Sequence, residues 1–213
     1  VLQIDITRGN VDPLPIAVSH FYAEKGMAVN LGKQLPDVVA ADLARSGLFK
    51  PIERSAFIQT PASMRVRPRF ADWRAINAQA LVTGLVRIDG NGLLRAEFRL
   101  WDVFAGQQML GLVYTSQPSN WRRVAHLISD IIYKRLTGED GYFDTRVVYV
   151  AETGAADRRV KRLAIMDQDG ANHRYLTDGK NLVLTPRFSP TLQEITYLSY
   201  FRNKPRVYIY NID

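Results

Sequence analysis

Apolar and polar residues alternate in several short runs along the first two thirds of the chain, and such alternation predicts strands. Leu2, Ile4 and Ile6 would share one face of an extended segment, so residues 1–7 predict a first strand. Short runs rich in apolar residues predict further strands over residues 14–18, 48–52, 81–88, 94–100 and 109–114, of which the run 94–100 alternates. The prolines near the second strand suit an edge or a strand start. In the run 94–100 every second residue is charged, which predicts a sheet with one face exposed to solvent or to a polar partner.

Apolar residues at three- and four-residue spacing predict helices between these strands. Residues 35–46 predict one helix, with Pro36 expected within its first turn. A short helix is predicted around residues 73–80, and the widest apolar stripe predicts a long helix over residues 121–136. This order of elements predicts an α/β domain over residues 1–140, with a mixed sheet and helices on one face.

Short strands and turns replace the helices after residue 140, and two of the strands recur. Residues 146–150 match residues 194–198, and residues 163–169 match residues 207–213. A spacing of roughly 40–50 residues is typical of β-propeller blades. Because a propeller closes with about 4–8 blades, residues 141–213 predict only the first one to two blades of an incomplete propeller. We therefore expect the chain to be a fragment; a small independent β-sheet is the alternative.

Composition limits the function without naming it. The net charge of +7 favours an acidic partner, but residues 1–140 carry 17 basic and 13 acidic residues and the rest carry 11 and 8. The only dense basic cluster, Arg65, Arg67 and Arg69, is interpreted as a solvated loop in preference to a phosphate site. The chain has no cysteine, which excludes disulfides and thiolate chemistry. It also has no apolar run long enough to span a bilayer.

A search for catalytic motifs finds no positive sign of enzyme chemistry. The histidines, His20, His126 and His173, are too far apart for a paired-histidine metal motif. His126 falls within the predicted long helix and is interpreted as a packed residue. Residues 167–172 resemble a calcium loop superficially, but the glycine is misplaced and the final glutamate is missing, so a hairpin turn is predicted. We therefore predict no catalytic, cofactor-binding or metal site.

Several segments match the motifs of a known family. Residues 39–49 look like its first-helix segment, residues 82–86 like its central strand and residues 136–150 like its junction into a propeller. Residues 167–172 and 186–190 look like its blade motifs, although the turn after residue 190 departs from the usual Ser-Pro-Asp-Gly. On these segments the chain resembles the TolB family of the Tol–Pal envelope system. The resemblance implies an α/β domain followed by a six-bladed propeller.

The resemblance also implies a function. It implies a non-enzymatic periplasmic adaptor that links the lipoprotein Pal and the inner-membrane protein TolA, maintains outer-membrane integrity and supports constriction during cell division. Export would use a signal peptide that this chain does not carry, and neither membrane insertion nor a nucleic-acid partner is implied. Pal would bind the propeller, mostly beyond Asp213, and TolA would bind the N-terminal segment. The matching residues are Val1, Leu2, Gln3, Ile4, Asp5, Ile6, Thr7 and Arg8.

Alternatives remain open at this point. Leu2, Ile4 and Ile6 could pack into their own sheet, or an exposed edge there could pair with a partner strand, and the two arrangements could alternate as a switch. A basic nucleic-acid-binding module would use Arg65, Arg67 and Arg69. A hydrolase would place its active site in a completed propeller channel.

Overall fold

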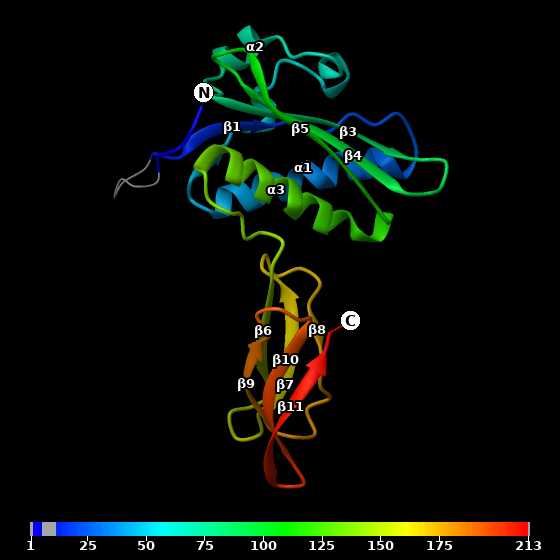
Figure 1. Ribbon diagram of the computed structural model, residues 1–213, viewed down its shortest axis with the longest axis vertical. Coiled ribbons are helices and arrows are strands. Elements are labelled where there is room, and N and C mark those ends of the chain that lie inside the picture. The colour runs from blue at the N-terminus through cyan, green and yellow to red at the C-terminus, as the bar shows by residue number, and fades with distance from the viewer. Residues whose placement is uncertain (1, 6–11, 213) are drawn as a thin grey trace. The chain divides into compact units, whose positions relative to one another are not determined.

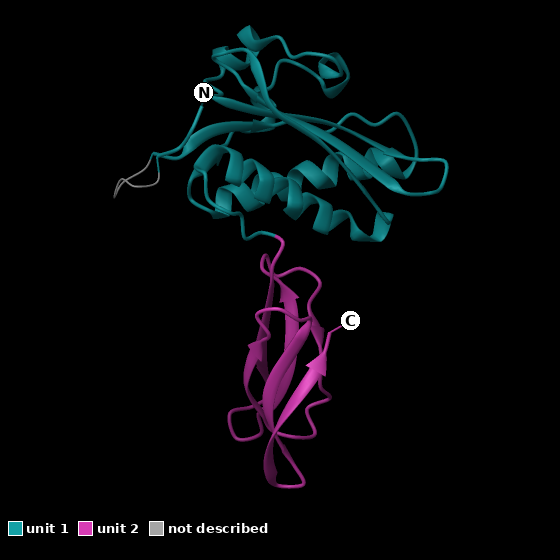
Figure 2. Ribbon diagram, viewed as in Figure 1, with its two compact units in different colours: residues 1–143 teal, residues 144–213 magenta. Residues whose placement is uncertain are grey.

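The protein divides into two compact units, residues 1–143 and residues 144–213, shown in a computed structural model (Figure 1 and Figure 2). The structure describes residues 2–5 and 12–212. The first unit is a mixed α/β structure, and the second consists of two three-stranded sheets. The predicted fold class is therefore confirmed.

The sheet of the first unit has five strands in the order β2-β1-β3-β4-β5. The strands are β1 (Leu14–Val18), β2 (Phe49–Pro51), β3 (Ala80–Ile88), β4 (Leu94–Asp102) and β5 (Gln107–Ser116). Strand β1 runs parallel to both of its neighbours, while β3, β4 and β5 are successively antiparallel. Strand β1 is thus internal in the sheet. Its proline, Pro15, lies at the start of the strand, which is one of the two predicted positions, the other being an edge strand.

The strand predicted over residues 1–7 is wrong for the part that the structure describes, because residues 2–5 join no sheet. Their burial still alternates: Ile4 is buried, and Gln3 and Asp5 on either side of it are exposed. The alternation of apolar and polar residues therefore corresponds to an extended segment with one buried side. The segment pairs with no strand, so its buried side contacts other parts of the unit.

Two long helices, α1 (Met27–Arg45) and α3 (Trp121–Thr137), cover one face of the sheet (Figure 1). The main core lies between these helices and the sheet, and its most deeply buried large side chains include Ile16, Leu35, Phe98, Ile128 and Leu136. Burial of such side chains stabilises the fold by about 1.5–3 kcal/mol each. The two layers are therefore held mainly by apolar packing.

Helix α1 begins well before the predicted start, so Pro36 lies inside the helix and the expectation of a first-turn proline is wrong. A proline has no N–H, which deprives the carbonyl four residues earlier, that of Gly32, of its helical partner. The N–H of Phe21 donates to the Gly32 carbonyl oxygen at 2.7 Å. The helix tolerates Pro36 because a loop outside the helix supplies the missing donor.

The opposite face of the sheet carries a smaller core under the short helix α2 (Phe70–Ala75), so the prediction that the helices lie on one face holds for α1 and α3 and is wrong for α2. Trp73 of this helix is 1 % exposed and packs near Leu81 and Trp101. Its indole N–H donates to Oε1 of Gln59 at 3.0 Å, so its polar end is satisfied as well. The cover is partial, and the part of this face formed by the far ends of β3 and β4 lies open.

The second unit repeats a hairpin. One sheet contains β6 (Arg146–Thr153), β7 (Val160–Asp167) and β8 (Arg174–Tyr175), and the other contains β9 (Val183–Phe188), β10 (Glu194–Phe201) and β11 (Lys204–Asn211). The hairpins β6–β7 and β10–β11 are the predicted repeat. The first sheet adds its third strand after the hairpin and the second adds it before, so each lacks one strand of a four-stranded blade.

The calcium-like segment between β7 and β8 forms the predicted hairpin turn. The N–H of Asp167 donates to the carbonyl of Ala171 at 2.9 Å, and Gly170 has a φ of 87°. A positive φ of this size favours glycine. The glycine is therefore explained by the turn.

Candidate functional site

The N-terminal segment, residues 2–5, is held through its backbone. The N–H of Ile4 donates to the carbonyl of Leu136 at 2.7 Å, in the last turn of α3. The N–H of Leu2 donates to Oδ2 of Asp102, the last residue of β4, at 3.2 Å. The last four carbonyls of a helix have no partner within it. The segment therefore occupies an acceptor that the end of α3 leaves available.

The side chains of the segment divide between core and solvent. Ile4 is 6 % exposed and belongs to the main core, and Leu2 packs partly buried against it. Gln3 and Asp5 are exposed. The structure thus places four of the eight predicted partner-binding residues. The remaining four, Val1, Ile6, Thr7 and Arg8, lie outside the described residues.

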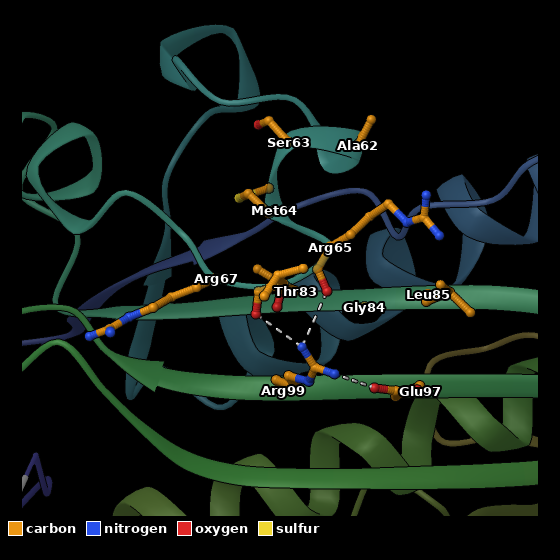
Figure 3. Close-up of a pocket in the computed structure, with 11 residues that line it drawn as sticks. Ala62, Ser63, Met64, Arg65, Arg67, Thr83, Gly84, Leu85, Glu97 and Arg99 are labelled. Atoms are coloured by element: carbon orange, nitrogen blue, oxygen red, sulfur yellow. Dashed lines mark hydrogen bonds and ion pairs between the residues drawn. The ribbon is translucent and has the colours of Figure 1, made fainter.

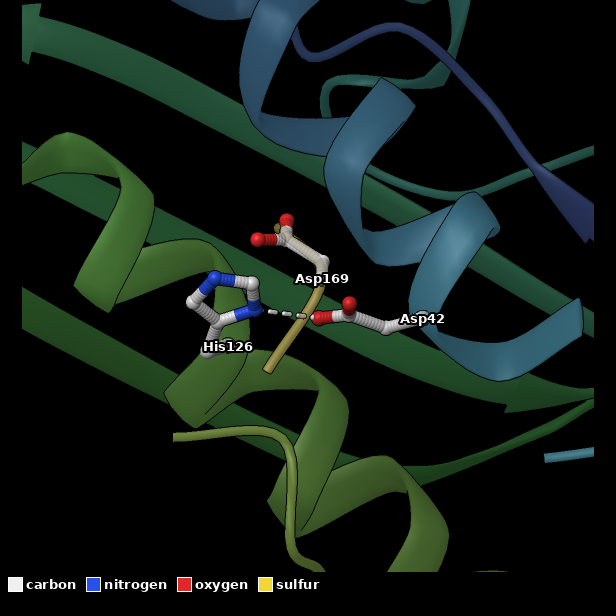
Figure 4. Close-up of side chains that lie close together, drawn as sticks. All are labelled: Asp42, His126 and Asp169. Atoms are coloured by element: carbon white, nitrogen blue, oxygen red, sulfur yellow. Dashed lines mark hydrogen bonds and ion pairs between the residues drawn. The ribbon is translucent and has the colours of Figure 1, made fainter. Parts of the chain in front are cut away.

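A buried polar pair joins the two long helices. Nδ1 of His126 on α3 lies 2.6 Å from Oδ2 of Asp42 on α1 (Figure 4), and the two side chains are 3 % and 0 % exposed. Arg45, one turn along α1, forms an ion pair with the other carboxylate oxygen. The prediction that His126 is a packed residue is confirmed. Its full burial supports a role in packing.

The partner of His126 was missed by the sequence analysis, although a signal for it exists. Asp42 follows Val38 and Val39 at the spacing that keeps residues on one face of a helix, so it falls on the buried side. A buried carboxylate requires a hydrogen-bonding or charged partner. That requirement predicts a partner for Asp42, but the choice of His126 depends on how the helices pack.

Each arginine of the predicted basic cluster has a contact within the first unit. The guanidinium of Arg65 lies 4.7 Å from the ring centre of Tyr22, and that of Arg67 lies 5.5 Å from the ring centre of Phe70. Arg69 pairs with the carboxylate of an aspartate three residues later, at 2.8 Å. All three arginines are exposed, which agrees with the interpretation of the cluster as a solvated loop.

A pocket of about 470 Å³ lies between this loop and strands β3 and β4 (Figure 3). Arg99 of β4 reaches across to the loop, where Nη1 donates to the carbonyls of Arg65 and Val66 at 3.3 and 3.2 Å. Its Nη2 donates to Oε1 of Glu97 at 2.7 Å. Arg99 therefore fixes the loop above the sheet while its own charge is neutralised by Glu97.

His20 provides a pH-dependent readout of this unit. Burial lowers its pKa from the usual 6.5, the nearby Arg54 lowers it further, and Asp37, 3.7 Å away, acts in the opposite direction. Because the folded pKa lies below the unfolded value, the protein is expected to lose stability as the pH falls from 6.5 through the folded pKa.

An NMR titration should place the pKa of His20 below 6.5 and should show it rising part of the way back in Arg54→Gln. The variant Arg87→Gln removes the same charge from a residue that does not act on His20, and it should leave the pKa unchanged. A wild-type pKa at or above 6.5 would contradict the role of burial.

Comparison with known proteins covers both units. Residues 2–109 match the family model for the TolB amino-terminal domain, and residues 133–213 match that for the TolB beta propeller domain. Over 212 residues the chain is 58 % identical to "Tol-Pal system protein TolB" of Paramagnetospirillum magneticum, an alignment that covers 100 % of this chain and 47 % of that protein.

A solved structure agrees with the whole chain. The crystal structure of TolB from Acinetobacter baumannii matches with a TM-score of 0.79 at 26 % identity, covering 100 % of this chain and 50 % of that one. The chain thus spans about half the length of the relatives it matches. Among the described residues, no helix is both long enough and apolar enough to cross a membrane.

Proposed function

This chain belongs to the TolB family, and on that premise we propose that it acts as a non-enzymatic adaptor of the Tol–Pal system in the periplasm. In this role it links the lipoprotein Pal to TolA, and it supports outer-membrane integrity and constriction during cell division. Residues 1–140 are the proposed first domain. Residues 141–213 are the opening one to two blades of the propeller that binds Pal.

The N-terminal segment carries the TolA part of the proposal. Within the described residues it joins no sheet, and it is held by two backbone N–H groups and the buried side chain of Ile4. Hydrogen bonds contribute about 1 kcal/mol each, and burial of an isoleucine contributes about 1.5–3 kcal/mol. Giving up these contacts costs about 4 kcal/mol, so a partner strand with an intrinsic affinity near nanomolar, about 12 kcal/mol, still binds with micromolar affinity after displacing the anchor. The segment is therefore suited to alternate between its own unit and TolA.

Deletion of residues 1–8 tests the assignment directly. Titration calorimetry with the periplasmic part of TolA should show at least a hundredfold loss of affinity, because the deletion removes the whole pairing segment. Circular dichroism should show the fold retained, with a lower Tm because Ile4 leaves the core. Unchanged TolA affinity would overturn the assignment.

A point variant separates partner pairing from internal packing. Gln3→Pro removes an N–H that makes no hydrogen bond with the residues that the structure describes, while the donors of Leu2 and Ile4 remain. Proline tolerates extended backbone but cannot donate to a strand ladder, so TolA affinity should fall while Tm stays within about a degree. Gln3→Ala is the matched control, and it should bind TolA as the parent chain does.

A further inference from the structure

The two edges of the five-stranded sheet differ in how open they are. Strand β2, at one edge, has three residues and ends in Pro51, and short length and proline both discourage pairing with another strand. Strand β5, at the other edge, has ten residues, and among the described residues only β4 pairs with it. Every second residue of such a strand directs its N–H and C=O away from the sheet. Strand β5 therefore presents a long row of unused main-chain donors and acceptors.

The composition of β5 adds to this openness. No charged residue occurs between Asp102 and Arg122, a stretch that contains all of β5. Natural proteins usually place charges, prolines or bulges on an exposed edge to prevent pairing. Here Leu112 and Val113 in the middle of the strand are 39 % and 41 % exposed. The strand has one irregularity, where Met109 has no partner on β4. Residues 110–116 pair regularly and carry neither a charge nor a proline, so this part of the edge is open.

An unneutralised pair of arginines lies on the open face of the sheet beside this edge. Arg87 of β3 stands opposite Arg95 of β4, and Arg95 stands opposite Thr115 of β5. Like charges directly opposite one another destabilise a sheet. Arg99 is neutralised by Glu97 at 2.7 Å, but within the described residues no carboxylate lies within 4 Å of Arg87 or Arg95. The pair is therefore a cationic site one strand from the free edge.

A neighbouring pocket extends the cationic surface. Its volume is about 590 Å³, and Arg87 lines it together with Arg65 and Lys25. Glu24 is the one carboxylate in its lining, 3.9 Å from Arg65. The pocket contains no residue of β4 or β5 and lies beside the other edge of β3, where Tyr22 bridges to Leu85. The positive charge thus extends from Arg95 across β3 and away from β5.

We propose that β5 accepts an extended acidic peptide of a partner protein as a sixth strand, with a carboxylate of the peptide beside Arg95. A residue paired opposite Thr115 projects to the same face as Arg95. Neighbouring strands lie about 4.8 Å apart, so a gap of roughly 10 Å between backbones is spanned by an arginine and a glutamate side chain. Main-chain hydrogen bonds supply the affinity, and the arginines make the site selective for a negatively charged peptide.

Charge and edge chemistry together favour a peptide over the other occupants. A second copy of the chain, paired through its own β5, would add an equally basic face, so like charges would accumulate. A nucleic acid would satisfy the arginines but offers no strand to the edge. The proposal uses residues outside the proposed TolA and Pal sites, and deletion of residues 1–8 should leave it intact, so the two proposals fail separately.

Fluorescence polarisation tests the proposal with a labelled nine-residue peptide that alternates glutamate with valine and threonine. The peptide should bind the 213-residue chain saturably, more weakly as salt rises, and a version with lysine for glutamate should not bind. Thr115→Glu sets a carboxylate of the protein itself beside Arg95 and should weaken binding about tenfold. Thr115→Gln, similar in size and uncharged, should stay within about twofold of the parent chain.

Two further variants separate local charge from net charge. Arg95→Gln should weaken binding about fivefold, as expected for an exposed ion pair worth about 1 kcal/mol. Arg206→Gln makes the same change of net charge in the second unit, at an exposed residue that forms no ion pair with any described residue, and should have no effect. Equal effects of both substitutions would overturn the site at Arg95.

Hydrogen exchange identifies the bound edge. The glutamate peptide should slow exchange at alternate amides of β5 between residues 107 and 116, which is the mark of an added strand. Absence of peptide binding, or binding without this protection, overturns the proposal. Concentration-dependent dimerisation that protects β5 would assign the edge to a second copy. An oligonucleotide that binds with β5 unprotected and that Thr115→Glu displaces would assign the face to nucleic acid, and either result overturns the proposal.

Discussion

Replacing Asp42 with alanine should lower the free energy of unfolding of the first unit by about 3–5 kcal/mol. The Asp42 carboxylate is fully buried between α1 and α3. It lies 2.6 Å from Nδ1 of His126 and forms an ion pair with Arg45. Alanine removes the acceptor while the imidazole stays in the core, so a polar group that has given up water loses its nearest partner. Removing one member of a buried pair is costly for this reason.

Tryptophan fluorescence during urea denaturation measures this effect in the first unit alone, because all three tryptophans, Trp73, Trp101 and Trp121, belong to it. Arg45→Ala is the matched control. It removes the other partner of Asp42, but its side chain is 37 % exposed, so the loss should stay below about 1 kcal/mol. If Asp42→Ala and Arg45→Ala lowered the free energy of unfolding equally, burial of the Asp42–His126 pair would not account for its contribution to stability.

Gly32→Ala should destabilise the first unit by about 2 kcal/mol, although alanine favours a helix over glycine by about 1 kcal/mol. A Cβ at this position would lie 2.6 Å from the carbonyl oxygen of Phe21. That oxygen is backbone and cannot rotate away, and the same loop donates the N–H that satisfies the Gly32 carbonyl. The steric cost of about 1–3 kcal/mol therefore adds to the weakening of a hydrogen bond, and together they exceed the gain in propensity.

The sign of the change decides this prediction. Urea midpoints should fall in Gly32→Ala, and a rise would show that helix propensity outweighs the close approach of the loop. Gly90→Ala is the control, because a Cβ there would meet nothing within 4 Å. Its free energy of unfolding should stay within about 0.5 kcal/mol of the parent value.

Local patterns along the chain were enough to predict most of the elements. A short apolar run located β1, alternation placed the buried side chains of β4 on one face, and the apolar stripe located α3. The repeat between β6–β7 and β10–β11 predicted propeller blades. These features depend on residues close together in the chain, and the backbone period of a strand or helix converts their spacing directly into one buried face.

Part of the candidate site could also be predicted in this way. The segment 39–49 and the junction 136–150 pointed to the correct family. The alternation of Leu2, Gln3 and Ile4 predicted a strand; the structure retains the buried side chain of Ile4 but not the pairing with a sheet. The alternation could not predict what this side chain packs on, because a period of two is the same whether the neighbour is a strand or the end of a helix.

The amino-acid sequence by itself determined the order of the elements, their buried faces, the repeat and the family. Only the tertiary structure decided which distant groups complete one another. It paired Asp42 with His126, supplied Phe21 as the donor that lets α1 continue through Pro36, and set Arg87 opposite Arg95 beside the free edge of β5. The physical reason is that each of these contacts depends on how helices cross and how strands register, and both are set by packing between segments far apart in the chain.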